Sequence, residues 1–458
     1  MNVNASAEGS LYELVCRGKK DTFFFKDSPK STYVFDNAYE PEGETLFERR
    51  IKQPKTAVEF GRTIEFEVEP VGDIIKSFSF IINLPSWLPQ PIQRIFGSCA
   101  IQDPTGVTYG YVNGISYFLF EKIQFYQDSI LLQEFSGDAL WATHVTEGTY
   151  ASTRVVAAIT GSHDGTPANI GKNAQPGQIR LKVPFIGCQD HGPGFPIRAA
   201  MSHTYTVKCK LRRLDQLVEA SDRRLNPSPW GKTFQYTTAT GPVTQFTALA
   251  VTDMQPLSIT METIQVYVSR EAQDRLTSKP LEVPCYNIYE NIFTLIPSDY
   301  TSGGLKKLRL DGCHPTSRIL WIIRSLPDIQ SNLLWKVHPN TEGPYYTSAS
   351  LIIAGQTRES PWDASVWRDV TNFSKEGIDS QTEINTMNWS LGYNHPNQLD
   401  GSINMSSADR PTLALGLLVP PTTNQGQNSY NTEIRIFTQG WTSFQTDGKG
   451  RAELLSFN

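Results

Sequence analysis

The clearest regularity along the chain is a series of short segments in which apolar and polar residues alternate. In Thr63–Glu69 every second residue is apolar, so one face of an extended strand would be buried and the other would carry carboxylates. Few segments show the period of an amphipathic helix. The pattern therefore predicts an all-β protein. The strands that it predicts lie at 63–69, 74–85, 117–127, 130–135, 179–187, 195–201, 205–213, 256–268, 305–310, 318–327, 412–420 and 432–445.

Two stretches half a chain apart share one layout. Ile123–Trp141 and Leu351–Trp367 each read as a strand, a polar turn, a second arm, an Asp-Ala pair and a tryptophan. The two tryptophans are 367 − 141 = 226 positions apart in a chain of 458 residues. An apolar strand that closes in Leu-Pro precedes each stretch, at 74–85 and 318–327. Because two features recur in the same order at nearly the same offset, we infer a tandem duplication.

Each half would hold roughly eight short strands joined by loops of unequal length, which suit Greek-key crossings better than an up-and-down barrel. The sequence therefore predicts two tandem eight-stranded jelly-roll barrels, a double jelly roll with long loops. The polar, charged segment Ser269–Pro280 marks the boundary between them. We expect a first jelly roll at 26–270 and a second at 271–458. Residues 1–25, which contain a capping-box pattern, would form a short N-terminal helical arm.

Charge and composition exclude several classes of function. The net charge is −5 and no run of lysine and arginine appears, which argues against direct nucleic-acid binding. No apolar stretch approaches the ~18 residues that cross a bilayer, and the first residues do not read as a secretory signal. The six cysteines are scattered without a Cys-x-x-Cys pair, so we expect free thiols in a reducing compartment. These features predict a soluble protein made in the cytosol.

Motifs that carry catalysis or metal binding are missing from the sequence. Gly-x-Ser-x-Gly, Gly-x-Gly-x-x-Gly and His-Glu-x-x-His do not occur. Cys188 precedes His191 and Cys313 precedes His314, but neither pair has further ligands at the spacing of a zinc site. We therefore predict no catalytic, cofactor-binding or metal-binding residues, and no enzymatic activity.

Two groups of side chains could involve sugars. Asn372, Asn388 and Asn404 stand in Asn-x-Ser frames and are candidates for glycosylation, as is Asn4. Without a secretory signal the frames can equally be chance sequons. Three tryptophans of the second half could form a sugar platform, although packing in the core is the commoner role for such residues. They are Trp362, Trp367 and Trp389.

Six segments, taken in order along both halves, match the pattern of one family. They are "GSLYELVCRGKKD" (9–21), the two strands of 47–85, the hairpin and helix of 121–141, the strands within 181–187 and 195–212, "HPTSRILWIIR" (314–324) and "INMSSADRPTLAL" (403–415). In this order they resemble the double jelly-roll major capsid proteins of large icosahedral DNA viruses of eukaryotes, of the iridovirus, phycodnavirus and marseillevirus kind. The resemblance covers most of the chain.

The resemblance implies a structural role. Members of that family form homotrimers, and each trimer is a pseudo-hexagonal capsomer that tiles the shell. The partners implied are other copies of the chain, neighbouring capsomers, and minor capsid and penton proteins. The N-terminal arm would face inward, toward minor capsid proteins or an internal membrane. No cofactor and no direct nucleic-acid contact are implied. The expected location is the virion capsid, assembled in the host cytoplasm.

Three other functions remain open at the level of sequence. The first is a minor capsid or vertex protein of the same fold. The second is a carbohydrate-binding β-sandwich used for attachment. The third is a glycosidase on a β scaffold, which would need two convergent carboxylates.

Overall fold

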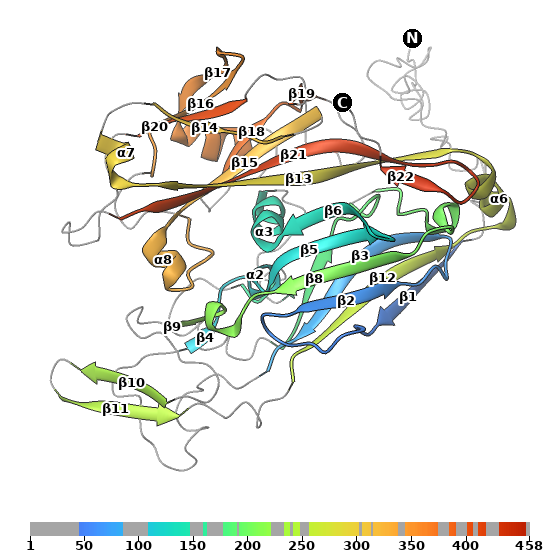
Figure 1. Ribbon diagram of the computed structural model, residues 1–458, viewed down its shortest axis with the longest axis horizontal. Coiled ribbons are helices and arrows are strands. Elements are labelled where there is room, and N and C mark those ends of the chain that lie inside the picture. Colours follow the sequence, from blue (N-terminus) through green and yellow to red (C-terminus); the bar gives the residue numbers. More distant parts are fainter. Residues whose placement is uncertain are drawn as a thin grey trace, which may run out of the picture. The chain divides into compact units, whose positions relative to one another are not determined.

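Figure 1 shows the protein as a computed structural model, in which the chain divides into two units between residues 44 and 45. All that follows concerns the second unit. The predicted arm and most of the predicted loops at 160–178 and 420–432 lie outside the described residues. Those described are 45–85, 109–146, 159–162, 177–189, 192–220, 233–238, 241–247, 256–301, 305–312, 315–337, 344–373, 384–390, 401–405, 411–417 and 430–454, with the backbone alone given for 233–238 and 241–247.

The strands that precede residue 270 form two four-stranded antiparallel sheets. The first has the order β1 (Leu46–Lys52), β12 (Ser258–Tyr267), β3 (Ile74–Asn83) and β7 (Gln178–Val183). The second has the order β2 (Thr63–Val68), β8 (Tyr205–Leu211), β5 (Phe120–Gln127) and β6 (Ile130–Ser136). Two small ribbons accompany them, β4 (Tyr109–Tyr111) with β9 (Val218–Ala220), and β10 (Thr233–Thr238) with β11 (Gly241–Thr247).

The strands that follow residue 280 form a second pair of sheets. One has the order β13 (Leu281–Leu295), β21 (Thr432–Thr446), β15 (Pro315–Ser325) and β18 (Asn385–Asn388). The other has the order β14 (Leu305–Arg309), β20 (Thr412–Gly416), β16 (Ser348–Ile353) and β17 (Gln356–Asp363). Two short strands extend the first of these sheets, β19 (Ile403–Asn404) beside β15 and β22 (Ala452–Leu454) beside β21.

The strand order is the same in both halves. When the eight principal strands of each half are counted along the chain, one sheet reads first-eighth-third-sixth and the other second-seventh-fourth-fifth. Among the described residues, no strand before residue 270 pairs with a strand after residue 280. The prediction of an all-β protein with two tandem eight-stranded jelly-roll barrels is confirmed.

The repeated hairpins are also present where the sequence predicts them. β5 and β6 are joined by Asp128 and Ser129, and β16 and β17 by Ala354 and Gly355. Both residues of the second loop have positive φ, 51° and 76°, as a type I′ turn requires. In the first loop Asp128 has a φ of 53°, and its carboxylate accepts a hydrogen bond of 2.9 Å from the backbone N–H of Thr204.

Short helices occupy some of the connections, and none of those described is long and apolar enough to span a membrane. Residues 195–201, predicted as a strand, make a single bridge at Phe195 and then a 3-10 turn, so that prediction is wrong. Pro196 has no N–H to continue a ladder, which explains the break. The helices are α2 (Ile115–Phe118), α3 (Gly137–Thr146), η1 (Ile197–Ala200), η2 (Leu214–Gln216), α6 (Arg270–Ser278), α7 (Pro297–Thr301), α8 (Leu326–Gln330) and the π-helix η4 (Val366–Val370).

Candidate functional site

Strand β15 shows how the two barrels meet. Ile319, Trp321 and Ile323 pack inside the second barrel. Leu320 and Ile322, which alternate with them, belong instead to the core cluster of the first barrel. Side chains alternate across a strand, so β15 is buried on both faces. Its inner face fills the second barrel, and its outer face is covered by the first.

Aromatic side chains continue this contact along the neighbouring strands. Tyr286 of β13 lies 6.2 Å from Phe135 of β6, between ring centroids, and 5.5 Å from Trp441 of β21. Phe444 of β21 lies 5.3 Å from Phe195 of the first barrel. Burial of whole aromatic rings on this scale is typical of a domain core or a permanent interface. We call this contact the junction.

Helix α3 of the first barrel lies next to the strands of the second barrel at the junction (Figure 1). It contacts β6 and β15, and almost all of its residues are buried. The helix begins at Gly137, where a Cβ atom would lie 2.2 Å from the carbonyl oxygen of Tyr117 and 2.4 Å from that of Phe120. Only glycine allows the helix to approach that closely.

A buried carboxylate of the first barrel pairs with arginines of both barrels. Asp138 of α3 is fully buried and pairs with Arg212, which follows β8 in the same barrel. From the second barrel, Arg324 approaches Asp138 at 2.5 Å and Arg435 at 3.2 Å. The three guanidinium groups hold the pKa of Asp138 well below its usual range despite burial, which alone would raise it.

The cluster is balanced in charge. Arg435 also pairs with Glu433 at 2.6 Å and with Glu290 of β13 at 3.0 Å, so three carboxylates face three guanidinium groups. Burial raises the pKa of Glu290, while Arg435 opposes that shift. The Arg324 guanidinium lies over the rings of Phe118 and Trp141, at 5.7 and 6.0 Å from their centroids. A buried pair of this kind gives little net stability, but it becomes costly when one partner is removed.

Side-chain hydrogen bonds connect strands of the first barrel to strands of the second. The Gln133 amide of β6 donates to the carbonyl oxygen of Tyr286 at 2.8 Å and accepts from the Ile186 N–H at 2.9 Å. The Gln127 amide donates to the carbonyl oxygen of Ala452 at 2.7 Å. These bonds join the barrels through side chains, since β6 and β13 do not form a ladder with each other.

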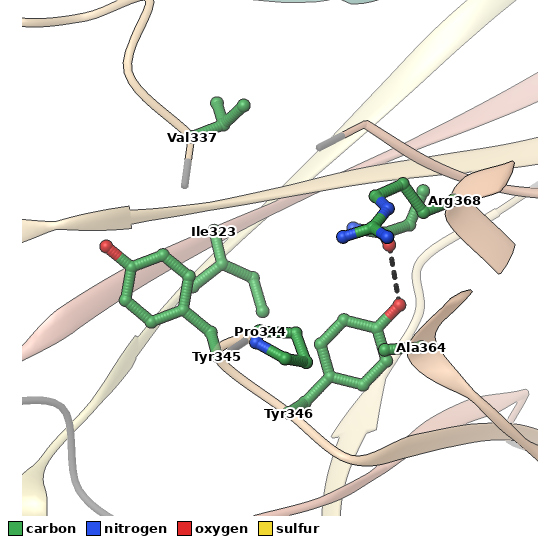
Figure 2. A pocket seen from close by; sticks show the side chains of 8 residues that line it. Ile323, Val337, Pro344, Tyr345, Tyr346, Ala364 and Arg368 are labelled. Carbon is green, nitrogen blue, oxygen red and sulfur yellow. Dashed lines mark hydrogen bonds between the residues drawn. The ribbon is translucent and has the colours of Figure 1, made fainter. Parts of the chain in front are cut away.

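Two hollows in the described part of the chain are relevant to the site. A groove of about 550 Å³ runs between β6 and β13, lined by Leu131, Ile288, Glu290 and Ile292 among others. The other, shown in Figure 2, lies in the second barrel beside Tyr346, whose hydroxyl donates to Asn385 at 2.6 Å. Its volume of about 10 Å³ has room for little more than one water molecule. The groove marks where the junction opens to solvent, and the second hollow is too small for a ligand.

The three candidate glycosylation sites differ in their surroundings. Asn372 is fully buried, and its amide donates to the carbonyl oxygens of Arg368 at 2.6 Å and Ile384 at 2.9 Å. Asn388 ends β18 and accepts from the Ser390 N–H at 2.8 Å. Asn404 is exposed. The amide of Asn372 is therefore inaccessible in this fold, whereas that of Asn404 is not.

Of the tryptophans and cysteines singled out in the sequence, Trp367 and Cys188 are buried, whereas Trp362 is exposed. Trp367 is buried and donates to the carbonyl oxygen of Ala349, and Trp389 donates to Glu359, so the three tryptophans do not form one exposed platform. Cys188 is buried, and burial raises the pKa of its thiol to about 12. His191 and the pair at 313–314 lie outside the described residues, within which no three acidic, histidine or cysteine side chains gather as metal ligands.

The charged residues of the junction were not predicted from the sequence. Two signs of them are visible in hindsight. Arg324 interrupts the apolar strand "RILWIIRS", and Asp138 stands in the "GDALW" helix start that the two halves share. Their pairing spans 324 − 138 = 186 positions, so nothing local in the sequence links them.

Fold and junction together define a double jelly-roll protein whose two barrels are fixed to each other. Solved structures of similar fold come from virus capsids. The PBCV-1 virus capsid matches with a TM-score of 0.68 and 14% identity, over 93% of this chain and 100% of that chain. The Faustovirus major capsid protein matches with a TM-score of 0.60 and 11% identity, over 90% and 92% of the two chains. No family model and no curated protein sequence matches the chain.

Proposed function

We propose that the protein is a major capsid protein that builds the shell of a large icosahedral DNA virus. In the proposed assembly, three copies form a homotrimer, and their six barrels surround a threefold axis. The trimer is then a pseudo-hexagonal capsomer, and many capsomers tile the faces of the shell. Cyclic closure of this kind prevents growth into open filaments.

The observation that carries this proposal is the rigid fusion of two barrels with the same strand order. Three such chains can approximate sixfold packing only if the two barrels keep a fixed angle. The buried charges around Asp138 and the rings around Tyr286 supply that rigidity. The likeness to the PBCV-1 virus capsid extends over 93% of the chain, which is what one would expect if the shared shape itself is the function.

The same proposal assigns the protein a structural role and no enzymatic activity. The charged side chains buried at the junction are paired with one another, as suits a fixed geometry. Within the virion, the chain would contact minor capsid and penton proteins as well as neighbouring capsomers. The arm at 1–25 would face inward, toward such proteins or an internal membrane. Assembly would take place in the host cytoplasm.

Two finer assignments belong to this proposal. We place the boundary between the barrels in Ser269–Pro280, so that the first jelly roll is 26–270 and the second 271–458. The pairing of strands only within each half supports this division. Among the three sequons, Asn404 is the acceptor we propose, because its side chain is exposed and that of Asn372 is buried.

Light scattering of the purified chain tests the proposal. One chain has a mass of 51.3 kDa, so the trimer would have 3 × 51.3 = 153.9 kDa. Electron micrographs of the same sample should show particles with a hexagonal outline. A chain that stays at 51.3 kDa at high concentration would contradict the capsomer and favour a monomeric role for the same fold.

A further inference from the structure

We propose that the groove between β6 and β13 binds an extended, basic segment of another protein, which pairs with the edge of β13 as an added strand. The groove belongs to a single chain, so this inference goes beyond the proposed function and does not depend on how copies of the chain assemble. We call this hollow the edge groove. Its lining includes Leu131, Glu134, Ile288, Glu290 and Ile292.

The edge groove has the size and the apolar rim of a binding site. Its volume of about 550 Å³ lies within the range of ligand sites, which is about 300–1,000 Å³. Two of its apolar side chains are exposed, Leu131 at 43% and Ile292 at 51%. Exposed apolar side chains gathered around a hollow indicate a surface that a ligand covers.

Two strand edges border the edge groove (Figure 1). β6 ends the strand order of its sheet and β13 begins that of its own, so no described strand pairs with either on the groove side. The Gln133 amide reaches the carbonyl oxygen of Tyr286, and the Ser136 hydroxyl donates to Glu290, so the two strands run in the same direction. A peptide that runs in the opposite direction would be antiparallel to both, which is the more stable pairing.

The backbone of β13 presents hydrogen-bonding groups to the groove. Tyr286 directs its carbonyl oxygen toward β6, from which it accepts a side-chain hydrogen bond of 2.8 Å. Backbone groups alternate between the two sides of a strand, and the register of β13 with β21 has no shift along the whole strand. Ile288, Glu290 and Ile292 therefore direct their N–H and carbonyl groups to the same side as Tyr286. An edge of this kind can accept a further strand through main-chain hydrogen bonds.

The charged side chains of the edge groove favour a basic ligand. Those that line it are Glu134, Glu290 and Lys122, which leaves one negative charge in excess. Lys122 pairs with Glu134 at 2.7 Å, and Arg435 pairs with Glu290 at 3.0 Å. Burial nevertheless raises the pKa of Glu290, so the charge of this carboxylate is incompletely balanced. A lysine or arginine side chain of the ligand would complete the balance.

A buried acceptor in the lining also favours a ligand that donates hydrogen bonds. The Asn287 amide donates to the carbonyl oxygen of Leu132 at 3.4 Å, but its Oδ1 atom is buried and accepts no hydrogen bond from the described residues. A buried acceptor without a donor costs free energy, and a donor supplied by the ligand would remove that cost. A peptide carries such donors along its backbone.

An extended peptide fits these features better than a lipid does. A lipid tail would cover the apolar side chains of Leu131, Ile288 and Ile292, but it has no groups that pair with the backbone of β13. In an added strand, alternate side chains can cover the apolar rim while the backbone pairs with the strand edge. The partner is therefore a protein with an extended segment in which apolar residues alternate with polar ones and flank a basic residue.

The test measures the fluorescence anisotropy of a short labelled peptide added to the full native chain. In this peptide, valine and threonine alternate around a central lysine. One analogue has glutamate in place of the lysine, and two others carry a methyl group on every second backbone nitrogen, in either frame. We expect the lysine peptide to bind and the glutamate analogue to bind about tenfold more weakly. Methylation in at least one frame should abolish binding, because it removes the N–H groups that face β13.

Two double variants locate the site on the chain. Leu131→Arg with Ile292→Arg places cations in the edge groove and should weaken binding of the lysine peptide by more than about tenfold. The matched control, Ile296→Arg with Leu305→Arg, changes exposed apolar residues outside the lining and should leave binding unchanged. Both variants should keep the melting temperature of the native chain, since all four side chains are exposed. Bound peptide should also slow hydrogen exchange at 286–292 of the native chain.

The inference would be overturned if the lysine peptide did not bind the native chain, or if it bound the Leu131→Arg, Ile292→Arg variant equally well. Equal binding of both methylated analogues would also overturn it, because the groove would then take an amphiphile without backbone pairing. These outcomes leave the proposed function standing, since that depends on the mass of the native chain in light scattering. A native chain that binds the peptide but stays monomeric would contradict the proposed function and support this inference.

Discussion

Strand β6 with helix α3 in the first barrel, and strand β17 with the π-helix η4 in the second, occupy the same place in the same strand order. They differ in what covers them. α3 lies against β15 of the second barrel, whereas Val370 of η4 and Phe373 beyond it are exposed. A duplicated barrel has two such edges and two such faces, and one chain can bring together only one pair. The comparison teaches that, when a duplicated chain buries the edge of one barrel at the junction, the equivalent edge of the other barrel stays exposed.

The two aspartates of the repeated pattern, Asp138 and Asp363, differ in the same way as the edges on which they lie. Asp138 is buried among Arg212, Arg324 and Arg435, and Asp363 is exposed. Since both stand before an alanine in the same pattern, the difference arises from the residues that face them.

Replacement of Asp138 should have the largest effect on stability. Asp138→Ala leaves three buried guanidinium groups without their central counter-charge, so we expect the free energy of unfolding to fall by about 3–5 kcal/mol. Asp363→Ala, the matched change in the second barrel, should cost only the lost cap, about 1 kcal/mol. Denaturant unfolding of both variants measures the two values. Equal losses would mean that the buried cluster does not anchor the junction.

Truncation on β15 tests whether its outer face belongs to a core. Leu320→Ala should lower the free energy of unfolding by about 2–5 kcal/mol, because a side chain enclosed by both barrels leaves a cavity. Ile51→Ala, on the exposed face of β1, should change it by no more than about 0.5 kcal/mol in the monomer. Thermal melts at low protein concentration compare the two. A small effect at Leu320 would argue that the barrels are loosely attached.

Removal of the Gln133 side chain tests the hydrogen bonds between the strand edges. Gln133→Ala leaves the Tyr286 carbonyl and the Ile186 N–H without their partner, which should cost about 1–3 kcal/mol. Gln356→Ala, on exposed β17, should be within about 0.5 kcal/mol of the native chain. Urea titration of each variant gives the difference. Indistinguishable midpoints would exclude a role for these bonds in stability.

The smallest expected effect is a dependence on pH that arises from Glu290. Burial raises its pKa above the ordinary value of 4.5, so the folded state binds this proton more tightly than the unfolded state. The stabilisation from the bound proton is complete below 4.5 and is lost as the pH rises through the folded pKa. The native chain should therefore lose stability relative to Glu290→Gln as the pH rises above 4.5.

The opposite sign applies to Asp138, whose lowered pKa stabilises the fold above its ordinary value of 3.8 and less as the pH falls below it. Measurements from pH 4 upward thus isolate Glu290. Glu134→Gln, at the rim of the same groove, is the control. A difference between the native chain and Glu290→Gln that does not vary with pH would refute the assignment.

Much of the fold follows from local sequence. Alternation predicted strands such as Thr63–Val68, and the turn at Asp128 predicted the first hairpin. The repeat of that hairpin predicted the second barrel. Strand β13 was missed, because its fifteen residues include a proline and several polar positions that obscure the alternation. Their burial depends on the first barrel, which the local sequence does not reveal.

The junction could not be predicted for the same reason. Asp138 meets Arg435 across 297 positions, and neither residue lies in a motif that suggests the other. For Asn372 the local sequence was misleading. Its sequon suggested an accessible site, but the tertiary fold buries the side chain. The exposed state of Phe47 and Trp362 is equally invisible in the sequence, where apolar strand residues read as core.

Hydrogen exchange, followed by mass spectrometry, tests most directly the claim that the junction covers the edge of the first barrel and leaves the equivalent edge of the second barrel exposed. The native chain would be measured at a low concentration, where any contact between copies is absent. We predict that the backbone amides of 356–373 exchange much faster than those of 130–146. Equal exchange of the two segments would contradict the account.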